Sequence, residues 1–195
     1  MTTGVANPQP AARVLADILP GSLVRDAQLV IASAGFVGLM AQISIHLSFT
    51  PVPITGQTLA VLLSSTALGW RRGLAAMSLY ALAGVLGLPW FAGGQSGYAG
   101  AAFGYIVGFV ACSAVCGWLA ERGADRRLRW SIPAMFLGEV VMYAIGVTWL
   151  GVDLHVSASQ AIALGLTPFI WGDVIKAAIA ALLLPGAWRL VRARR

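Results

Sequence analysis

The chain has 195 residues, of which 58% are hydrophobic and only 10% are charged, and its mean hydropathy is +0.81. A soluble domain carries about 25% charged residues, so these values predict an all-α integral membrane protein, with room for about six spans in one membrane domain covering residues 1–195. The formal net charge is +6, but the basic residues are scattered between apolar runs, which excludes a nucleic-acid-binding patch.

Residues 1–25 form a polar N-terminal segment. They contain no compact apolar region followed by a small-residue cleavage site, so a cleaved signal peptide is not expected. A short amphipathic helix is expected near residues 11–18. The first span follows at about residues 27–47. On it, Ala34 and Gly38 form a pair of small residues four positions apart, which would let another helix approach closely.

Residues 48–55 form an uncharged loop that contains Pro51 and Pro53. Each proline restricts its own φ and pushes the preceding residue towards extended backbone, so we predict a rigid loop. This loop either covers a pocket or is only a tight connection. Two short spans follow, at about residues 56–70 and 73–88. Spans this short indicate helices that stop inside the protein, where irregular backbone can line a cavity.

A second uncharged loop, residues 89–100, is rich in glycine and aromatic residues. Glycine lets the backbone approach a ligand, and aromatic side chains offer flat apolar surfaces with polar tips. The loop is interpreted either as part of a binding site or as an interfacial loop. The fourth span, about residues 101–120, has a small residue at every fourth position, which predicts close helix packing. This repeat consists of Gly100, Gly104, Gly108, Cys112 and Cys116.

The last two spans carry charged residues within apolar sequence. Glu139 lies in the fifth span, about residues 132–151, and is a second candidate for a functional carboxylate. Because it is nearer the arginine-rich side, we expect it to cap or pair locally. Asp173 and Lys176, the only lysine, lie in the sixth span, about residues 168–190. Positions i and i+3 share a helix face, and a charge near the bilayer centre costs about 2.5–3.5 kcal/mol. The pair is interpreted either as an intrahelical ion pair or as a group that meets a substrate.

The distribution of arginine predicts the orientation in the membrane. Every arginine falls in the N-terminal segment, in the loops after the second and fourth spans, or at the C-terminal end. By the positive-inside rule, residues 1–25 and both termini are cytoplasmic. Asp173 and Lys176 then lie in the outer third of the membrane, below the two uncharged loops. We therefore expect an outward-facing cavity with apolar walls and a few polar groups.

Motifs of the common enzyme classes are missing from the sequence. The only lysine is not part of a Gly-Lys-Ser/Thr sequence, so a Walker A loop is excluded. The sequences His-Glu-x-x-His and Gly-x-Ser-x-Gly are also absent. Cys112 and Cys116 have no histidine or further cysteine nearby, so they are not expected to bind a metal. We predict no enzymatic activity, no cofactor and no metal site.

Four segments carry a resemblance to a known family. They are Phe49-Thr-Pro-Val-Pro-Ile-Thr-Gly-Gln-Thr58, Gly87-Leu-Pro-Trp-Phe-Ala-Gly-Gly94, Gly104-Tyr-Ile-Val-Gly-Phe109 and Gly172-Asp-Val-Ile-Lys-Ala177. In this order and spacing they resemble BioY, the biotin-binding S component of energy-coupling factor (ECF) transporters. The resemblance implies six transmembrane helices with the S-component fold in a bacterial plasma membrane. It also implies biotin capture from outside, and docking on a transmembrane coupling (T) subunit whose two cytoplasmic ATPase partners hydrolyse ATP.

The same resemblance implies which residues form the sites. Asp173 can accept a ureido N–H of biotin, while Lys176 or Gln95 can donate to the ureido oxygen, or Lys176 can meet the valerate carboxylate. Ala34 and Gly38 match the partner-docking face on the first helix. The implied substrate-binding residues are Phe49, Gln57, Trp90, Phe91, Gly94, Gln95, Ser96, Tyr98, Tyr105, Asp173 and Lys176.

Two other functions compete with biotin capture. The first is a stand-alone, proton-coupled secondary transporter of a small vitamin or carboxylate, in which Asp173 or Glu139 carries the proton. The second is a small membrane enzyme that uses Asp173 as a base, and the missing motifs count against it. The sequence leaves open whether the chain works alone, as a homo-oligomer, or with a shared or dedicated energising module.

Overall fold

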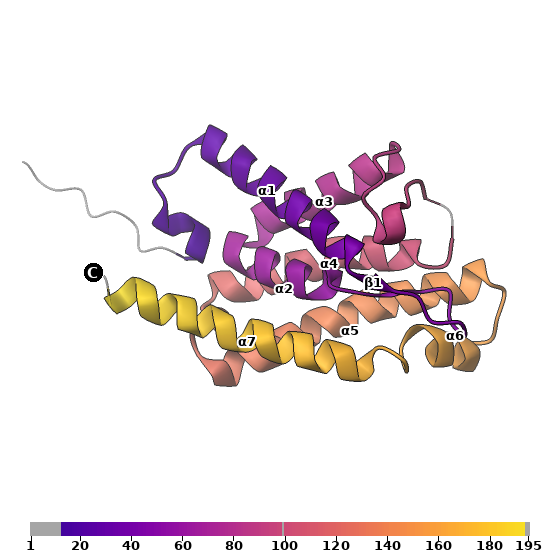
Figure 1. The fold of residues 1–195 in the computed structure, drawn as a ribbon. Coiled ribbons are helices and arrows are strands. Elements are labelled where there is room, and N and C mark those ends of the chain that lie inside the picture. The colour runs from indigo at the N-terminus through magenta and orange to yellow at the C-terminus, as the bar shows by residue number, and fades with distance from the viewer. Residues whose placement is uncertain (1–12, 99, 194–195) are drawn as a thin grey trace, which may run out of the picture.

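A computed structural model of the chain describes residues 13–98 and 100–193 (Figure 1). Apart from one small hairpin, the described residues form helices, as the composition predicts. The α-helices are α1 (Leu23–Gln42), α2 (Gln57–Leu68), α3 (Trp70–Val85), α4 (Phe103–Glu121), α5 (Leu128–Asp153), α6 (Ala158–Gly165) and α7 (Ile170–Ala193). The short elements are the 3-10 helices η1 (Leu15–Ile18), η2 (Ala92–Gly94) and η3 (Ala124–Arg126) and the antiparallel strands β1 (Ser44–Ile45) and β2 (Ile54–Thr55).

Helix α4 lies at the centre of the bundle and packs against α2, α3 and α5. Its small residues make this packing close. A Cβ atom added at Gly104 would lie 2.2 Å from the Cβ atom of Trp149, and one added at Gly108 would lie 2.7 Å from the carbonyl oxygen of Met142. From the other side, a Cβ atom at Gly138 would lie 2.3 Å from the sulfur of Cys116. The interpretation of the small-residue repeat as a packing surface is therefore confirmed.

The turn between α2 and α3 depends on a single glycine. Gly69 has φ of +82°, a left-handed backbone conformation that side chains with a Cβ atom rarely adopt. A Cβ atom there would also lie 2.7 Å from Oε1 of Glu121, which accepts a hydrogen bond of 3.2 Å from the backbone N–H of Trp70. Glu121, the last residue of α4, thus holds the start of α3 in place.

The end of helix α1 and the presence of helix α6 differ from the prediction. Helix α1 ends at Gln42, before the predicted end near residue 47, and the chain continues into β1. The Nε2 group of Gln42 donates to the carbonyl oxygens of Gly38, Trp90 and Phe91, which fixes this helix end. Helix α6 was not predicted. It begins with a capping box in which Ser157 and Gln160 bind each other's backbone N–H groups.

Helices α5 and α7 pack against each other and run antiparallel (Figure 1). Helix α6 joins them at one end. At the other end, the indole N–H of Trp188 on α7 donates to the carboxylate of Asp125 in η3, just before α5. Burial raises the pKa of the Asp125 carboxyl group. Because the two helices are antiparallel, a residue one turn later on α5 lies at the same depth as a residue one turn earlier on α7, counted from a contacting pair.

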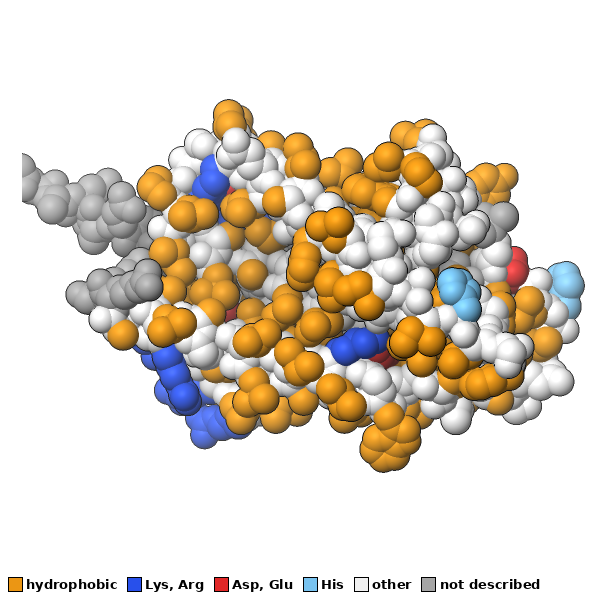
Figure 2. Space-filling model, in the orientation of Figure 1, with side chains coloured by type: hydrophobic (Ala, Val, Ile, Leu, Met, Phe, Trp, Pro, Cys, Tyr) orange, Lys and Arg blue, Asp and Glu red, His pale blue; other side chains and the backbone are white. Residues whose placement is uncertain are grey.

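Within residues 13–98 and 100–193, four helices, α1, α4, α5 and α7, are long and apolar enough to cross a membrane. On the face seen in Figure 2, hydrophobic side chains are spread widely, and most of the visible Lys and Arg side chains lie near the end where α7 finishes. This separation of basic and apolar surface is typical of a membrane protein whose basic end faces the cytoplasm.

Candidate functional site

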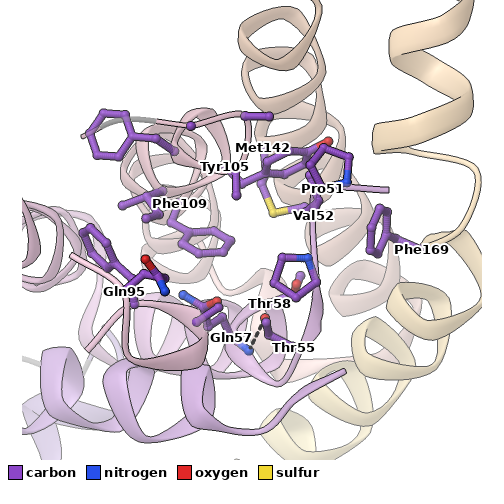
Figure 3. A pocket seen from close by; sticks show the side chains of 18 of the residues that line it. Pro51, Val52, Thr55, Gln57, Thr58, Gln95, Tyr105, Phe109, Met142 and Phe169 are labelled. Atoms are coloured by element: carbon purple, nitrogen blue, oxygen red, sulfur yellow. Dashed lines mark hydrogen bonds between the residues drawn. The ribbon is translucent and has the colours of Figure 1, made fainter. Parts of the chain in front are cut away.

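A cavity of about 330 Å³ lies between α2, α4, α5 and α7 (Figure 3). The loop that follows β1 and the loop that precedes α4 close it. Its volume falls in the range of about 300–1,000 Å³ found for small-molecule sites. The walls are mainly apolar, with polar side chains at a few positions. The apolar lining residues include Pro51, Val52, Phe91, Phe103, Ile106, Phe109, Met142 and Phe169.

An ion pair forms the charged part of the cavity wall. The Nζ group of Lys176 donates to Oδ1 of Asp173 at 2.8 Å, and the side chains are only 17% and 6% exposed. The intrahelical pair predicted from their spacing is therefore present. The hydroxyl group of Tyr143 on α5 donates to Oδ2 of Asp173. Both oxygens of this buried carboxylate are thus hydrogen-bonded, as a charge in an apolar surrounding requires.

Helix α6 and the proline-rich loop are tied to this region by side-chain hydrogen bonds. The hydroxyl group of Tyr105, which lines the cavity, donates to the carbonyl oxygen of Gly165 at 2.6 Å. The hydroxyl group of Thr50 donates to the carbonyl oxygen of Leu164 at 2.8 Å. The prediction of a loop that covers a pocket is confirmed, because Pro51, Val52 and Pro53 line the cavity.

Polar side chains from α2 and the glycine-rich loop also reach the cavity. Gln57 lines it and donates from Nε2 to the hydroxyl oxygen of Tyr80 at 2.8 Å. Its backbone N–H binds the side chain of Thr55, which Figure 3 marks with a dashed line. The side chains of Gln95 and Ser96 make no hydrogen bond within the described residues. Their polar groups are thus available to a ligand.

Seven of the predicted substrate-binding residues line this cavity, and four do not. The seven are Gln57, Phe91, Gln95, Ser96, Tyr105, Asp173 and Lys176. Of the others, Phe49 and Tyr98 point outward, with 62% and 69% of their surface exposed. Gly94 forms a left-handed turn, and the indole of Trp90 packs against α1 and donates to the carbonyl oxygen of Tyr80. In this structure, these four residues lie outside the cavity wall.

Several lining residues were not singled out from the sequence, among them Thr58, Phe109, Met142, Tyr143 and Phe169. Tyr143 lies one turn from Glu139 on α5. Its hydrogen bond to Asp173 arises from packing between two helices, which residue spacing along one helix does not reveal. Oε1 of Glu139 is buried and has no hydrogen-bond partner among the described residues. The expectation that Glu139 caps or pairs locally is therefore wrong.

The comparisons with known proteins agree with the motifs in the sequence. The model of the BioY family matches residues 9–193. The chain belongs to the BioY family. It is 39% identical to a biotin transporter BioY from Rhizobium etli over 75% of this chain and 82% of that relative. It is also 39% identical to a biotin transporter BioY from Thermotoga maritima, over 73% of this chain and 83% of that relative.

A solved structure supports the fold of this BioY family member. The crystal structure of the S-component for biotin from an ECF-type ABC transporter matches with a TM-score of 0.77. The match covers 85% of this chain and 92% of the other, at 21% sequence identity. Together with the bacterial relatives and the long apolar helices, the family identifies a multi-pass bacterial membrane protein and a transport protein, not an enzyme.

In this BioY family member, the two predicted docking residues lie on the side of α1 that packs against the rest of the chain. Ala34 is buried, and Gly38 lies under the indole of Trp90, whose Cε3 atom would be 3.0 Å from a Cβ atom there. The outward face of α1 instead carries Ala32, Gly35 and Leu39, beside a shallow groove. A close approach at Gly38 occurs within this chain, against Trp90, and Gly38 also lines the groove. The docking role of Ala34 and Gly38 stays a prediction.

Proposed function

We propose that this chain is the biotin-binding subunit of an ECF-type ABC transporter and takes biotin from outside the cell into the cavity. The observation that carries the proposal is the buried Asp173–Lys176 pair in a mainly apolar cavity, under two uncharged loops, in a member of the BioY family. The relatives from Rhizobium etli and Thermotoga maritima carry the name biotin transporter. Biotin matches the cavity chemically, because it joins a polar ureido ring and a carboxylate to an apolar thioether ring and alkyl chain.

The polar groups of the cavity match the two polar ends of biotin. Asp173 accepts a ureido N–H, because each of its oxygens accepts one hydrogen bond within the protein and can accept a second. Lys176 donates either to the ureido oxygen or to the valerate carboxylate. Gln95 and Ser96 offer hydrogen bonds from the loop, and Phe91 packs on the apolar part of the ligand. These contacts require neither a cofactor nor a metal.

We further propose that six helices cross the membrane, namely α1, α2, α3, α4, α5 and α7, with both termini in the cytoplasm. Helix α2, at 12 residues, is about 18 Å long, which is shorter than the hydrocarbon core of about 30 Å. It is mostly buried among other helices, where irregular backbone at membrane depth is tolerated. The basic residues next to α3 and between α4 and α5 support the cytoplasmic assignment of that end.

The energy for release is proposed to come from partner subunits. The chain has no ATP-binding motif, so a transmembrane coupling subunit and two ATPase subunits would supply ATP hydrolysis. The outward face of α1, with Ala32, Gly35 and Leu39, is a candidate surface for the coupling subunit, because small residues allow close approach in lipid. Self-association of the chain is compatible with this arrangement.

The proposal is tested by calorimetric titration of the purified chain with biotin, with thiamine and riboflavin as controls. We expect saturable binding of biotin and none of the two other vitamins. A chain that fails to bind biotin contradicts the proposal. Uptake into proteoliposomes then separates it from a proton-coupled carrier: uptake that continues without ATPase partners and collapses with the proton gradient would favour the carrier.

A further inference from the structure

Glu139 is a buried acidic residue that the cavity itself does not use. It lies on α5 with 4% of its surface exposed, and its Oε1 atom has no hydrogen-bond partner among the described residues. The chain has seven acidic residues, and Glu139 is the one that lies in the middle of a long helix. An unpaired acceptor at this depth is costly, so a donor that reaches Oε1 would stabilise it.

The antiparallel packing of α5 and α7 brings Glu139 to the level of Lys176. Tyr143 on α5 and Asp173 on α7 meet through their hydrogen bond. Glu139 precedes Tyr143 by four residues, about 6 Å along the helix, and Lys176 follows Asp173 by three, about 4.5 Å. Both steps run toward the same end of the bundle. Glu139 and Lys176 therefore lie at a similar level on neighbouring helices.

Asp173 and Glu139 also lie on one groove between α5 and α7, while only Asp173 lines the cavity. Glu139 therefore lies on the groove side of Asp173 and Lys176 on the cavity side, so Glu139 does not line the cavity itself. A lysine ammonium group has three N–H donors, and among the described residues Asp173 is the one hydrogen-bond acceptor for Lys176. The structure thus holds two carboxylates for one buried ammonium group, with one carboxylate engaged and the other unpaired.

Each oxygen of Asp173 already accepts one hydrogen bond, so a ligand N–H that binds Oδ1 shares this oxygen with Lys176 and weakens its hold on the ammonium group. If Lys176 simply left Asp173, a positive charge would remain unpaired in an apolar site, which is strongly unfavourable. We propose that Glu139 accepts Lys176 when a ligand N–H takes its place on Asp173, so that the ion pair is transferred and not broken. This inference rests on the proposed function, and it makes Glu139 a positioning residue that acts through Lys176.

A double-mutant cycle tests the inference. Biotin affinity and the unfolding temperature of the empty protein are measured for the parent, Glu139→Gln, Lys176→Met and the double variant. We expect Glu139→Gln to weaken biotin binding about tenfold in the parent, and to change it less than about twofold when Lys176 is already Met. Asp153→Asn, an exposed change of the same chemistry at the end of α5, should leave affinity unchanged. Equal losses from Glu139→Gln in both backgrounds would overturn the inference.

An infrared difference spectrum gives a second reading that does not depend on a Lys176 variant. Addition of biotin to the parent should change a carboxyl band that is missing from the spectrum of Glu139→Gln. Identical biotin-induced spectra from parent and variant contradict the transfer of Lys176. A parent that does not bind biotin at all counts against the proposed function instead, so the two failures are distinguishable.

Discussion

The hydroxyl group of Tyr143 donates a hydrogen bond to the carboxylate of Asp173 across the interface between α5 and α7. This bond joins the two helices at the cavity wall and leaves Oδ1 of Asp173 to Lys176. The orientation of the buried carboxylate therefore depends on a residue 30 positions earlier in the chain. Three of the predictions below follow from the way this wall is built.

Loss of the Tyr143 hydroxyl group should weaken ligand binding without unfolding the protein. Hydrogen bonds to charged groups contribute about 1.5–3 kcal/mol, so Tyr143→Phe should reduce biotin affinity about tenfold or more. Calorimetry on the purified variant measures this. Thr148→Val is the matched control, because it removes a hydroxyl group from the same helix that binds only the carbonyl oxygen of Ala144. Equal affinity in Tyr143→Phe and the parent would show that the bond does not orient Asp173 for the ligand.

The Asp173–Lys176 pair can serve the fold, the ligand or both, and one set of variants separates these roles. Asp173→Asn removes the carboxylate that forms the ion pair with Lys176, so it should lower the unfolding temperature. It should also weaken biotin binding by at least about tenfold. Combining it with Lys176→Met removes both charges and should restore the unfolding temperature. We expect biotin affinity to stay low in the combined variant. Recovery of both properties would reduce the pair to a structural role.

Residues inside and outside the cavity should respond differently to truncation. Gln95 lines the cavity with an unbonded amide, whereas Tyr98 in the same loop points outward. Gln95→Ala should weaken biotin binding by severalfold, and Tyr98→Ala should leave it within about twofold of the parent, since a lost hydrogen bond costs about 1 kcal/mol. Titration of both variants measures this difference. The opposite ranking would mean that the loop rearranges when the ligand binds.

The proposed topology predicts which side of the membrane each loop faces. In intact cells, His155→Cys at the end of α5 should react with a membrane-impermeant maleimide, and Arg127→Cys before α5 should react only after the cells are opened. The native Cys112 and Cys116 are buried, so they should give little background. Labelling of Arg127→Cys in intact cells would place the basic end outside.

The outward and inward faces of α1 predict two different defects. Gly35 has open space around it, so Gly35→Leu should leave biotin affinity unchanged and reduce uptake in the presence of the partner subunits. Gly38→Leu should lower the unfolding temperature, because even a Cβ atom there would press against Trp90. Measurement of stability, affinity and uptake on both variants checks this. Normal uptake by Gly35→Leu would remove this face of α1 from the docking surface.

Features that depend on one helix could be predicted from the sequence, whereas features that depend on packing could not. The ion pair of Asp173 and Lys176 follows from helical spacing, and the packing of α4 follows from its small residues. The meeting of Tyr143 with Asp173 depends on how α5 and α7 pack, which leaves no local pattern.

The orientation of side chains in the loop before α4 and the presence of the short helix α6 could not be predicted from the sequence either. Composition marks the loop before α4 as aromatic, but left-handed glycines decide which side chain turns inward. Phe91 lines the cavity while its neighbour Trp90 turns to α1. Helix α6 has only eight residues, too few for a clear hydrophobic period, and its capping box was the one local signal.

Trp90 and Phe91 are joined by one peptide bond and face opposite sides of the loop. Phe91 forms part of the cavity wall, and Trp90 forms part of the shallow groove beside the outer face of α1. The side chain of Gln42 holds the carbonyl groups of both residues to the end of α1. A change in the position of Phe91 at the cavity is therefore coupled through the backbone to a change of Trp90 in the groove.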